Sequence, residues 1–375
     1  GFTALLGGMG ATAFGLATNH MGMLAFGQES DLLAIAFLCV AFAGVIRLRK
    51  GEWLLGGSLL ALGISVSVSY NFNQTTYIWL IPILSYLVFS PTSKEILKPR
   101  KGIHMIAVIA GAIALGFLSN SSLLWNQHHY SSAALEVSTV TEDSIQSNTN
   151  LHGNSIVELF TYVLPGIRGG ASREVLNSDH SYVRTTGNLV APLYWGNQDG
   201  PYSPPYVSIV FFVLCIIGFF YNARSLTLWF SISAPLVMIL SLSGIFGGLS
   251  HLIQALPHTH LQLNVTGLSS ALNMLLIVYG LSSLNSWIER KKSIDFRRSF
   301  LLGASLVGII LLGFILGGFL TGFQDGTSGT TALEELRKST YFSNIFKVFL
   351  LSLMTLAALY LNIKKRLPDL WMIFV

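Results

Sequence analysis

Residues that could take part in chemistry are concentrated in two short polar segments between apolar stretches of the chain. One segment holds an amide and two carboxylates, Gln28, Glu29 and Asp31, and the other holds Asn71, Asn73, Gln74 and Tyr77. Carboxylates can transfer protons, whereas amides and phenols bind ligands through hydrogen bonds. Polar groups beside apolar segments are costly unless they face protein or a water-filled cavity. Both segments are therefore candidate site residues, and a hydrated turn is the alternative interpretation of each.

Metal and nucleotide chemistry have little support in the residue pattern. Histidines pair at His128-His129 and at His258 and His260, but neither pair has the firm third ligand that a metal site needs. The chain also lacks a Walker loop, a Gly-x-Ser-x-Gly motif and a dinucleotide-binding fingerprint. The sequence therefore predicts no metal ligands, and solvated histidines are the favoured interpretation.

The composition predicts a membrane protein. Hydrophobic residues make up 52% of the 375 residues and charged residues only 10%, whereas soluble domains carry about a quarter charged residues. The apolar residues are grouped, and stretches such as 301–320 and 345–361 are long enough to cross a hydrocarbon core as helices. The net charge of +5 comes from short basic clusters between these stretches, which argues against nucleic-acid binding. The two cysteines, Cys39 and Cys215, lie inside apolar blocks, which argues against a disulfide framework.

The alternation of apolar and basic segments predicts about ten transmembrane helices. Apolar blocks cover 1–18, 31–47, 53–69, 76–90, 103–121, 205–221, 228–246, 265–287, 299–321 and 343–363, and a truncated block begins at 369. Alternate connections carry 16 of the 22 lysines and arginines, so these connections should face the cytoplasm. Most acidic residues and histidines fall on the other side, either because those connections are longer or because that face carries the chemistry. The chain begins without Met and ends within an apolar run, so we interpret it as an internal piece of a longer protein.

The blocks define an all-α polytopic membrane protein in three parts. Residues 1–121 form a first transmembrane block of five spans, residues 122–204 form a large extracytoplasmic loop region, and residues 205–375 form a second block of five spans and a truncated one. Within the loop region, 155–164 is predicted to be an amphipathic helix that lies in the membrane interface. Tyr194 and Trp195 are of the kind that anchors a chain at the headgroup level.

Four motifs, in order and at similar spacing, resemble the YfhO family of bacterial membrane proteins. The strongest is Tyr194-Trp195-Gly196-Asn197-Gln198, which leads to Pro204-Pro205-Tyr206-Val207. The others are Arg49-Lys50-Gly51-Glu52-Trp53-Leu54-Leu55-Gly56-Gly57, Asn71-Phe72-Asn73-Gln74-Thr75-Thr76-Tyr77, and Leu164-Pro165-Gly166 with Gly169-Gly170. The YfhO family belongs with the C-type membrane glycosyltransferases, which depend on polyprenyl phosphate.

The resemblance implies an inverting glycosyltransferase of the bacterial cytoplasmic (inner) membrane. It would transfer a sugar from a polyprenyl-phosphate-linked donor to a cell-envelope acceptor at the extracytoplasmic face. Arg168 would lie near the donor phosphate, and Tyr194 and Trp195 would pack against sugar or lipid. The remaining substrate-binding residues would be Asn71, Gln74, Tyr77 and Gln198.

The catalytic carboxylates and the partners follow from the same resemblance. The principal catalytic aspartate of C-type enzymes lies in a first outer loop, upstream of this fragment, so Glu29 or Asp31 would act as a second acidic group. The partners would be membrane lipid, the lipid-linked sugar and an envelope glycan, and no nucleic acid. The resemblance leaves open whether a divalent cation or further membrane subunits take part.

Two departures from the family pattern motivate other functions. Gly27-Gln28-Glu29-Ser30-Asp31 stands where the family has Gly-His-x-x-Lys, and Gln262-Leu263 stands where it tends to carry Phe-Arg. One alternative is a non-catalytic scaffold subunit of a larger membrane complex. The other is a transporter of a lipid-linked sugar, which would need a polar pathway through the inner halves of the predicted spans, and these are almost wholly apolar.

Overall fold

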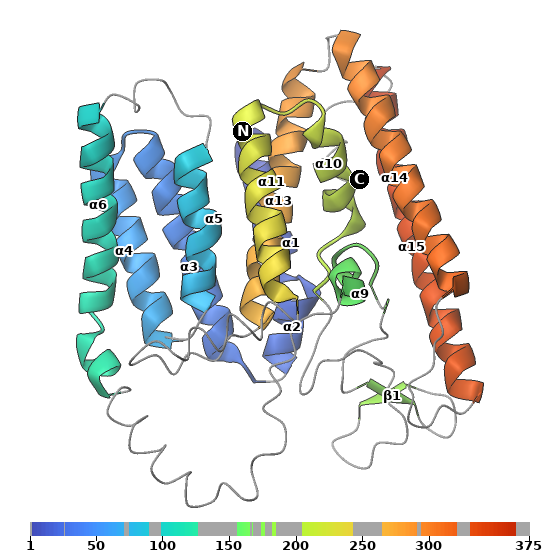
Figure 1. The fold of residues 1–375 in the computed structure, drawn as a ribbon, viewed down its shortest axis with the longest axis horizontal. Coiled ribbons are helices and arrows are strands. Elements are labelled where there is room, and N and C mark those ends of the chain that lie inside the picture. Colours follow the sequence, from blue (N-terminus) through green and yellow to red (C-terminus); the bar gives the residue numbers. More distant parts are fainter. Residues whose placement is uncertain are drawn as a thin grey trace, which may run out of the picture. The chain divides into compact units, whose positions relative to one another are not determined.

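The protein is almost entirely α-helical over the residues that the computed structural model describes. These are residues 2–25, 27–70, 75–89, 99–126, 156–165, 167, 174–176, 182–184, 205–242, 265–290, 294–320 and 331–364. The helices are α1 (Phe2–Gly15), α2 (Thr18–Ala25), α3 (Glu29–Arg49), α4 (Trp53–Tyr70), α5 (Thr75–Phe89), α6 (Pro99–Leu118), α9 (Ile156–Leu159), α10 (Ile209–Phe219), α11 (Arg224–Ser241), α13 (Val265–Arg290), α14 (Ile294–Leu320) and α15 (Thr331–Ile363) (Figure 1). A 3-10 turn, η1 (Phe160–Tyr162), follows α9, and strands β1 (Glu174–Leu176) and β2 (Tyr182–Arg184) pair in antiparallel register. The predicted helical fold class is thus confirmed, with one short strand pair in addition.

Six helices of the described chain are long and apolar enough to cross a membrane. They cover Glu29–Arg49, Trp53–Tyr70, Arg224–Ser241, Gly267–Glu289, Arg297–Phe319 and Arg337–Ile363. Shorter apolar helices cover Ala4–Gly15, Ile78–Phe89, Gly102–Leu118 and Ile209–Phe219. Each of the ten complete predicted blocks therefore contains an apolar helix, and six of these helices reach the length of a span. The truncated block from 369 lies outside the described residues. The chain has the architecture of a multi-pass helical membrane protein.

The described residues group into two compact units, each built from segments distant in sequence. Unit 1 draws on Gly1–Gly22, Asn154–Phe230 and Leu272–Val375, and unit 2 draws on Met23–Gly153 and Ser231–Ala271. The three predicted parts were continuous in sequence because they followed the order of membrane crossings. Packing follows complementary helix surfaces instead, so each unit combines early and late segments of the chain.

In unit 2, α3 and α4 form a hairpin whose backbones are in direct contact. A Cβ added at Gly44 would lie 2.6 Å from the backbone nitrogen of Leu60, and one added at Gly56 would lie 2.6 Å from that of Leu48. Gly63 is as close to the backbone of α3 farther along the hairpin. Small residues permit such an approach in lipid, where no hydrophobic force drives helices together. The glycines that the sequence shows in this region are therefore a packing seam.

The α3–α4 turn explains the basic motif that precedes Trp53. Gly51 has φ +86°, a conformation that favours glycine, and joins the two helices in a tight turn. Nη1 of Arg47 donates hydrogen bonds to both carboxylate oxygens of Glu52, each at 3.1 Å. The Arg49–Gly57 motif therefore has a structural use as the turn of this hairpin and the start of α4.

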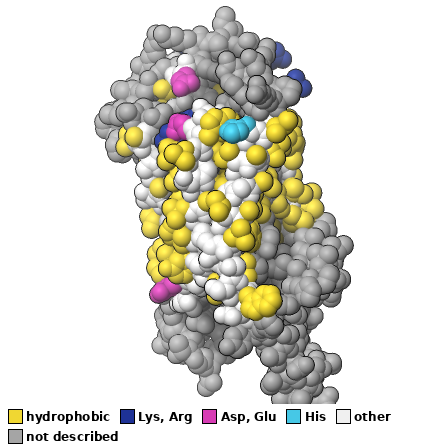
Figure 2. Space-filling view, turned by 90° about the vertical axis from the view of Figure 1, so that its left-hand side faces the viewer, with side chains coloured by type: hydrophobic (Ala, Val, Ile, Leu, Met, Phe, Trp, Pro, Cys, Tyr) yellow, Lys and Arg dark blue, Asp and Glu magenta, His cyan; other side chains and the backbone are white. Residues whose placement is uncertain are grey.

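Helix α6 packs along α4 and presents an apolar outer surface. An added Cβ at Gly116 would lie 2.8 Å from Ile64, and Nδ2 of Asn120 donates to the Ser65 carbonyl oxygen at 2.8 Å. On the outer side, Ile103, Ile106 and Leu115 are exposed. Hydrophobic side chains extend along most of the corresponding face of the molecule, with acidic, basic and histidine side chains near its ends (Figure 2). This distribution is that of a lipid-facing surface.

Unit 1 packs α10, α13, α14 and α15 around an aromatic and aliphatic core. Trp287 of α13 is fully buried, and its ring meets Phe300 of α14 at a centroid distance of 5.8 Å. Gly218 of α10 lies against Ser283 of α13, whose backbone oxygen accepts a hydrogen bond from the Tyr221 hydroxyl. The close approach at glycine and the buried rings hold these helices together.

The segment predicted to be an interfacial amphipathic helix forms α9 and η1 and packs into unit 1. Val163 and Leu164 belong to its core, and the Phe160 ring makes an edge contact with Phe314 at 5.4 Å. Phe160 is nevertheless 44% exposed, whereas the polar Glu158 and Thr161 are buried. The inner side of this segment thus faces protein, and its position at the membrane interface stays a prediction.

Candidate functional site

Most of the predicted site residues lie outside the part of the chain that the structure describes. These are Asn71, Gln74, Arg168, Tyr194, Trp195 and Gln198. Tyr77 belongs to the first turn of α5. The structure therefore neither brings these residues together nor separates them, and their roles stay predictions.

Glu29 and Asp31, the predicted acidic pair, both lie in the first turn of α3. Gly27, with φ +75°, makes the turn before them, and the Gln28 backbone N–H donates to the Met23 carbonyl oxygen at 2.8 Å. Glu29 is exposed and Asp31 is half-buried. Carboxylates in a first turn stabilise a helix through its dipole, so this position serves α3 irrespective of catalysis.

A buried hydrogen bond in unit 2 joins the first turn of α5 to α4. The hydroxyls of Ser67 on α4 and Thr76 on α5 are 2.9 Å apart, and both residues are buried. One turn later, Nε1 of Trp79 donates to the Ser270 hydroxyl at 3.0 Å. Thr76 of the Asn71–Tyr77 motif thus has a structural role in joining α5 to α4, and residues 71–74 lie outside the described part of the chain.

Tyr206, from the motif that ends the long loop region, is fixed beside the start of α2 in unit 1. Its backbone N–H donates to the Thr18 hydroxyl oxygen at 2.8 Å, and its carbonyl oxygen accepts from the Thr18 backbone N–H at 3.1 Å and from the Thr18 hydroxyl at 3.0 Å. The Tyr206 phenol oxygen accepts from the backbone N–H of Ile209, in the first turn of α10, at 3.0 Å. The chain therefore returns from the loop region to a defined position at the α1–α2 junction.

A buried polar cluster lies directly beside this attachment. Nδ2 of Asn273 on α13 donates to Oδ1 of Asn19 on α2 at 2.8 Å, and both side chains are buried. His20 follows Asn19, is only 1% exposed, and its Nδ1 lies 2.6 Å from the Phe14 carbonyl oxygen. Because a carbonyl can only accept, Nδ1 carries the proton and donates. The cluster of Asn19, His20 and Asn273 is hereafter called the polar cluster.

The imidazole of His20 is neutral near pH 7. His20 lies between the apolar helix Ala4–Gly15 and the candidate span that starts at Glu29. Burial lowers its pKa, and the hydrogen bond to the Phe14 carbonyl oxygen offsets only part of that effect. With Nδ1 protonated, Nε2 presents a lone pair that can accept a hydrogen bond or a proton.

Among its described residues, unit 1 also buries two ionisable side chains, those of Glu158 and Arg337. Glu158 of α9 is 0% exposed and Arg337, near the start of α15, is 1% exposed. Ionisable residues within membrane proteins are costly and commonly mark functional sites. Unit 1 thus buries ionisable side chains as well as the polar cluster.

The chemistry available to the polar cluster is hydrogen bonding, with His20 as the single group able to take up a proton near neutral pH. In the described ranges, no group of three or more His, Cys, Asp or Glu side chains could hold a metal ion. Amide and imidazole groups suit the recognition of hydroxyls, which donate and accept hydrogen bonds.

Sequence reasoning missed the polar cluster because each member has an ordinary position in the pattern. Asn19 and His20 belong to a connection between apolar blocks, where polar residues are expected. Asn273 lies inside the apolar block 265–287, and a carboxamide within a predicted span is a signal that could have been used. Its partner, 254 residues away in sequence, has no such signal.

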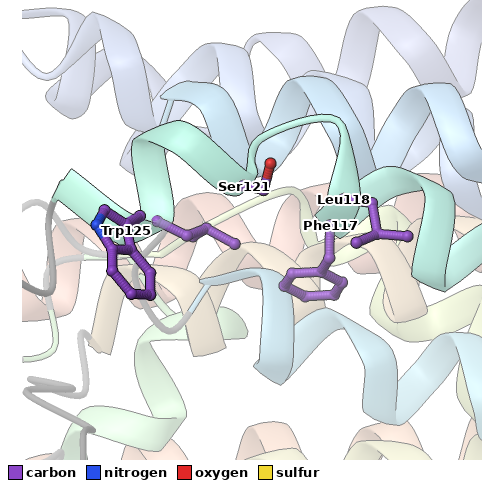
Figure 3. Close-up of a pocket in the computed structure, with 5 residues that line it drawn as sticks. Phe117, Leu118, Ser121 and Trp125 are labelled. Atoms are coloured by element: carbon purple, nitrogen blue, oxygen red, sulfur yellow. The ribbon is translucent and has the colours of Figure 1, made fainter.

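One surface depression carries no chemistry. It measures about 320 Å³ and is lined by Phe117, Leu118, Ser121, Leu124 and Trp125, from the end of α6 and the helical turn that follows (Figure 3). The lining is apolar apart from one hydroxyl, and Leu118 and Trp125 are largely exposed. It belongs to the lipid-facing surface of α6.

Comparison of the chain with known protein families, with curated proteins and with solved structures finds no match. The resemblance to the YfhO family therefore rests on the sequence motifs alone.

Proposed function

We propose that the protein is a membrane glycosyltransferase, which moves a sugar from a polyprenyl-phosphate-linked donor to a cell-envelope acceptor at the extracytoplasmic face of the bacterial inner membrane. The proposal includes ten membrane-spanning helices, with the loop region 122–204 outside. It also includes membership of the YfhO-like, C-type group.

One observation carries the proposal. The Tyr206 motif, which belongs to the family resemblance, is hydrogen-bonded to Thr18 at three points beside buried Asn and His side chains. A lipid-linked sugar needs hydrogen-bonding groups next to apolar helix surface, because its tail lies in lipid and its sugar at the interface. Polar side chains next to apolar helices of unit 1 meet this requirement.

The roles of individual residues follow from the donor's chemistry. Arg168 supplies a positive charge for the phosphate, since a guanidinium forms bidentate hydrogen bonds with phosphate oxygens. Tyr194 and Trp195 pack against sugar or lipid, and Asn71, Gln74, Tyr77 and Gln198 contribute hydrogen bonds. Glu29 or Asp31 supplies an acidic group that assists deprotonation of the acceptor hydroxyl.

A non-catalytic scaffold is the second candidate. The exposed position of Glu29 at the first turn of α3, where a carboxylate stabilises the helix, favours it. A scaffold would retain the hairpins and the Tyr206 attachment but would transfer no sugar.

Transfer by the full-length protein decides between the two candidates. Membranes that contain the protein are supplied with radiolabelled polyprenyl-phosphate sugars, and label in envelope polymer is measured. We expect transfer by the wild type, a loss of at least about tenfold in Arg168→Ala, and near-wild-type transfer in the control Arg173→Ala, from the same loop region. A tenfold loss corresponds to about 1.4 kcal/mol, within the range of one charge-assisted hydrogen bond. Absence of transfer in the folded wild type, for every donor sugar tried, would favour the scaffold.

The orientation has its own test. A cysteine introduced at Asn148 should react with an impermeant maleimide in intact cells, and one introduced at Lys94 should react only after the membrane is opened. Protection of the Asn148 position in intact cells would invert the topology and remove the outward-facing site.

A further inference from the structure

The polar cluster contains buried hydrogen-bonding atoms that the protein does not satisfy. The bond between Asn273 Nδ2 and Asn19 Oδ1 leaves Asn19 Nδ2 as a donor and Asn273 Oδ1 as an acceptor. Neither atom has a hydrogen-bond partner among the described residues, and the same holds for Nε2 of His20. Buried polar groups in native proteins are nearly always paired with protein or with ordered water. The polar cluster brings three such atoms together, because Asn19 and His20 are neighbours in the sequence and Asn273 is hydrogen-bonded to Asn19. We therefore expect a ligand that pairs with these atoms.

The atom types restrict that ligand. The amide nitrogen of Asn19 can only donate, whereas Asn273 Oδ1 and the Nε2 lone pair of His20 can only accept while the imidazole is neutral. A cation would be repelled by the amide N–H, and a carboxylate or phosphate ester without a proton could not donate to the two acceptors. An oxygen that carries hydrogen satisfies both kinds of atom. A buried water commonly makes about three hydrogen bonds and can donate to both acceptors. A hydroxyl has a single proton, so it can accept from Asn19 and donate to one of the two acceptors.

Contact with lipid does not explain the unpaired amide atoms, because Asn273 lies in a buried part of the protein. Of the candidate span Gly267–Glu289, 83% is buried, against 28–44% for the other five candidate spans. Asn273 itself is 0% exposed. The open amide atoms therefore face the interior of the protein, where leaving each one unsatisfied costs about 1–3 kcal/mol.

We infer that Asn19, His20 and Asn273 form a hydroxyl-binding site, which holds an oxygen that both donates and accepts hydrogen bonds. This oxygen comes either from a bound water or from a hydroxyl of the sugar substrate. The second source rests on the proposed function, whereas the first does not. With a sugar hydroxyl, the lone pair of His20 Nε2 would orient the substrate by accepting its proton in a hydrogen bond.

Water contact with the cluster can be measured directly in the intact protein. The chain is labelled with ¹⁵N-histidine and ¹⁵N-asparagine, placed in lipid bilayers, and studied by solid-state NMR with magnetisation transfer from water protons. A His20→Gln variant identifies the His20 signal among those of the nine histidines. We expect rapid transfer from water to His20 Nε2 and to the side-chain amide of Asn19. Absence of transfer to both groups, with and without added lipid, would overturn the site.

Two added lipids distinguish the sources of the oxygen. Decaprenyl-phosphate glucose carries the sugar, and decaprenyl phosphate alone is the matched control. Loss of water contact with the first lipid only assigns the site to a sugar hydroxyl, whereas unchanged contact with both assigns it to bound water. Equal loss with both lipids would overturn assignment to the sugar. A chain that transfers no sugar but keeps its water contacts would disprove the proposed function and leave the site in place.

Variants on one helix give a further check. Asn273→Leu removes the partner of Asn19 and should reduce water transfer to the Asn19 amide to background. Asn285→Leu is the matched control, because Asn285 lies on the same helix and donates to the exposed Glu289 at 2.9 Å. It should leave the Asn19 signal unchanged. The wild-type measurement does not depend on Asn273→Leu, so misfolding of this variant would leave the inference testable.

Discussion

The α3–α4 hairpin of unit 2 and the polar cluster of unit 1 use buried space in opposite ways. The hairpin brings backbone against backbone through Gly44, Gly56 and Gly63. The cluster buries Asn19, His20 and Asn273, and each has an atom without a hydrogen-bond partner in the described chain. Close packing stabilises a fold, whereas unsatisfied polar atoms destabilise it. Stability alone therefore explains the hairpin, whereas the polar cluster should have a function that compensates for the stability it loses.

The largest expected effect is in the hairpin, because it has no space for one methyl group. In Gly56→Ala the new Cβ meets backbone and Leu48 atoms that cannot rotate away, so the helices must separate. We expect a loss of about 3 kcal/mol or more, at or above the upper end of the usual cost of overpacking. Thermal unfolding of the purified protein in detergent measures the loss.

Gly111→Ala is the matched control for this substitution. Gly111 lies in α6 of the same unit, and an added Cβ there has nothing within 4 Å. The variant should unfold at the same temperature as wild type or slightly above it, since alanine favours the helix. Equal destabilisation by the two alanines would show that the seam is not the source of the effect.

The next largest effect is expected at the attachment of Tyr206. Thr18→Val keeps the side-chain shape but removes the oxygen that accepts from the Tyr206 backbone N–H at 2.8 Å. An unsatisfied part-buried N–H should cost about 1–3 kcal/mol. The control is Thr12→Val in α1, whose exposed hydroxyl bonds only to the Gly8 carbonyl oxygen. A cost in Thr18→Val no greater than in Thr12→Val would mean that the loop region returns without this anchor.

The two regions also differ in how far the sequence could predict them. The hairpin could be predicted in outline, because two apolar blocks joined by a short basic segment form a local pattern. The Asn19–Asn273 bond joins residues 254 positions apart, and no local pattern specifies such a pairing. The apolar blocks gave the positions of the helices for the same local reason, whereas the discontinuous make-up of the two units depends on complementary helix surfaces.

The predicted site was harder still, since its members come from segments that are far apart in the sequence. Glu29 and Asp31 were predicted to be catalytic acids. Their position in the first turn of α3 also gives them a role in stabilising the helix, and sequence periodicity alone does not distinguish this role from catalysis. Tyr206 was noted only as part of a motif. Its bonds to Thr18 depend on where a long loop region ends in space, which sequence spacing does not determine.

The pH dependence of stability gives a smaller effect that is specific to the polar cluster. The pKa of His20 is lowered in the folded protein by burial, whereas in the unfolded chain it returns to about 6.5. As the pH falls through about 6.5, the unfolded chain gains a proton before the folded protein does, so stability decreases. His20→Gln should remove this part of the decrease in unfolding temperature, and His104→Gln, at an exposed position, should leave it in place.

The smallest effect is expected at the ion pair in the hairpin turn, which tests whether charge or backbone fixes that turn. Arg47 and Glu52 lie 3.1 Å apart, but their side chains are 47% and 39% exposed, so water weakens their attraction. Glu52→Gln should cost no more than about 0.5 kcal/mol, and less in high salt. Gly51→Ala in the same turn should cost about 1–2 kcal/mol, because φ +86° is unfavourable for alanine. A greater loss in Glu52→Gln than in Gly51→Ala would mean that the turn depends on its charges, and the hairpin would then resemble the polar cluster in relying on specific polar contacts.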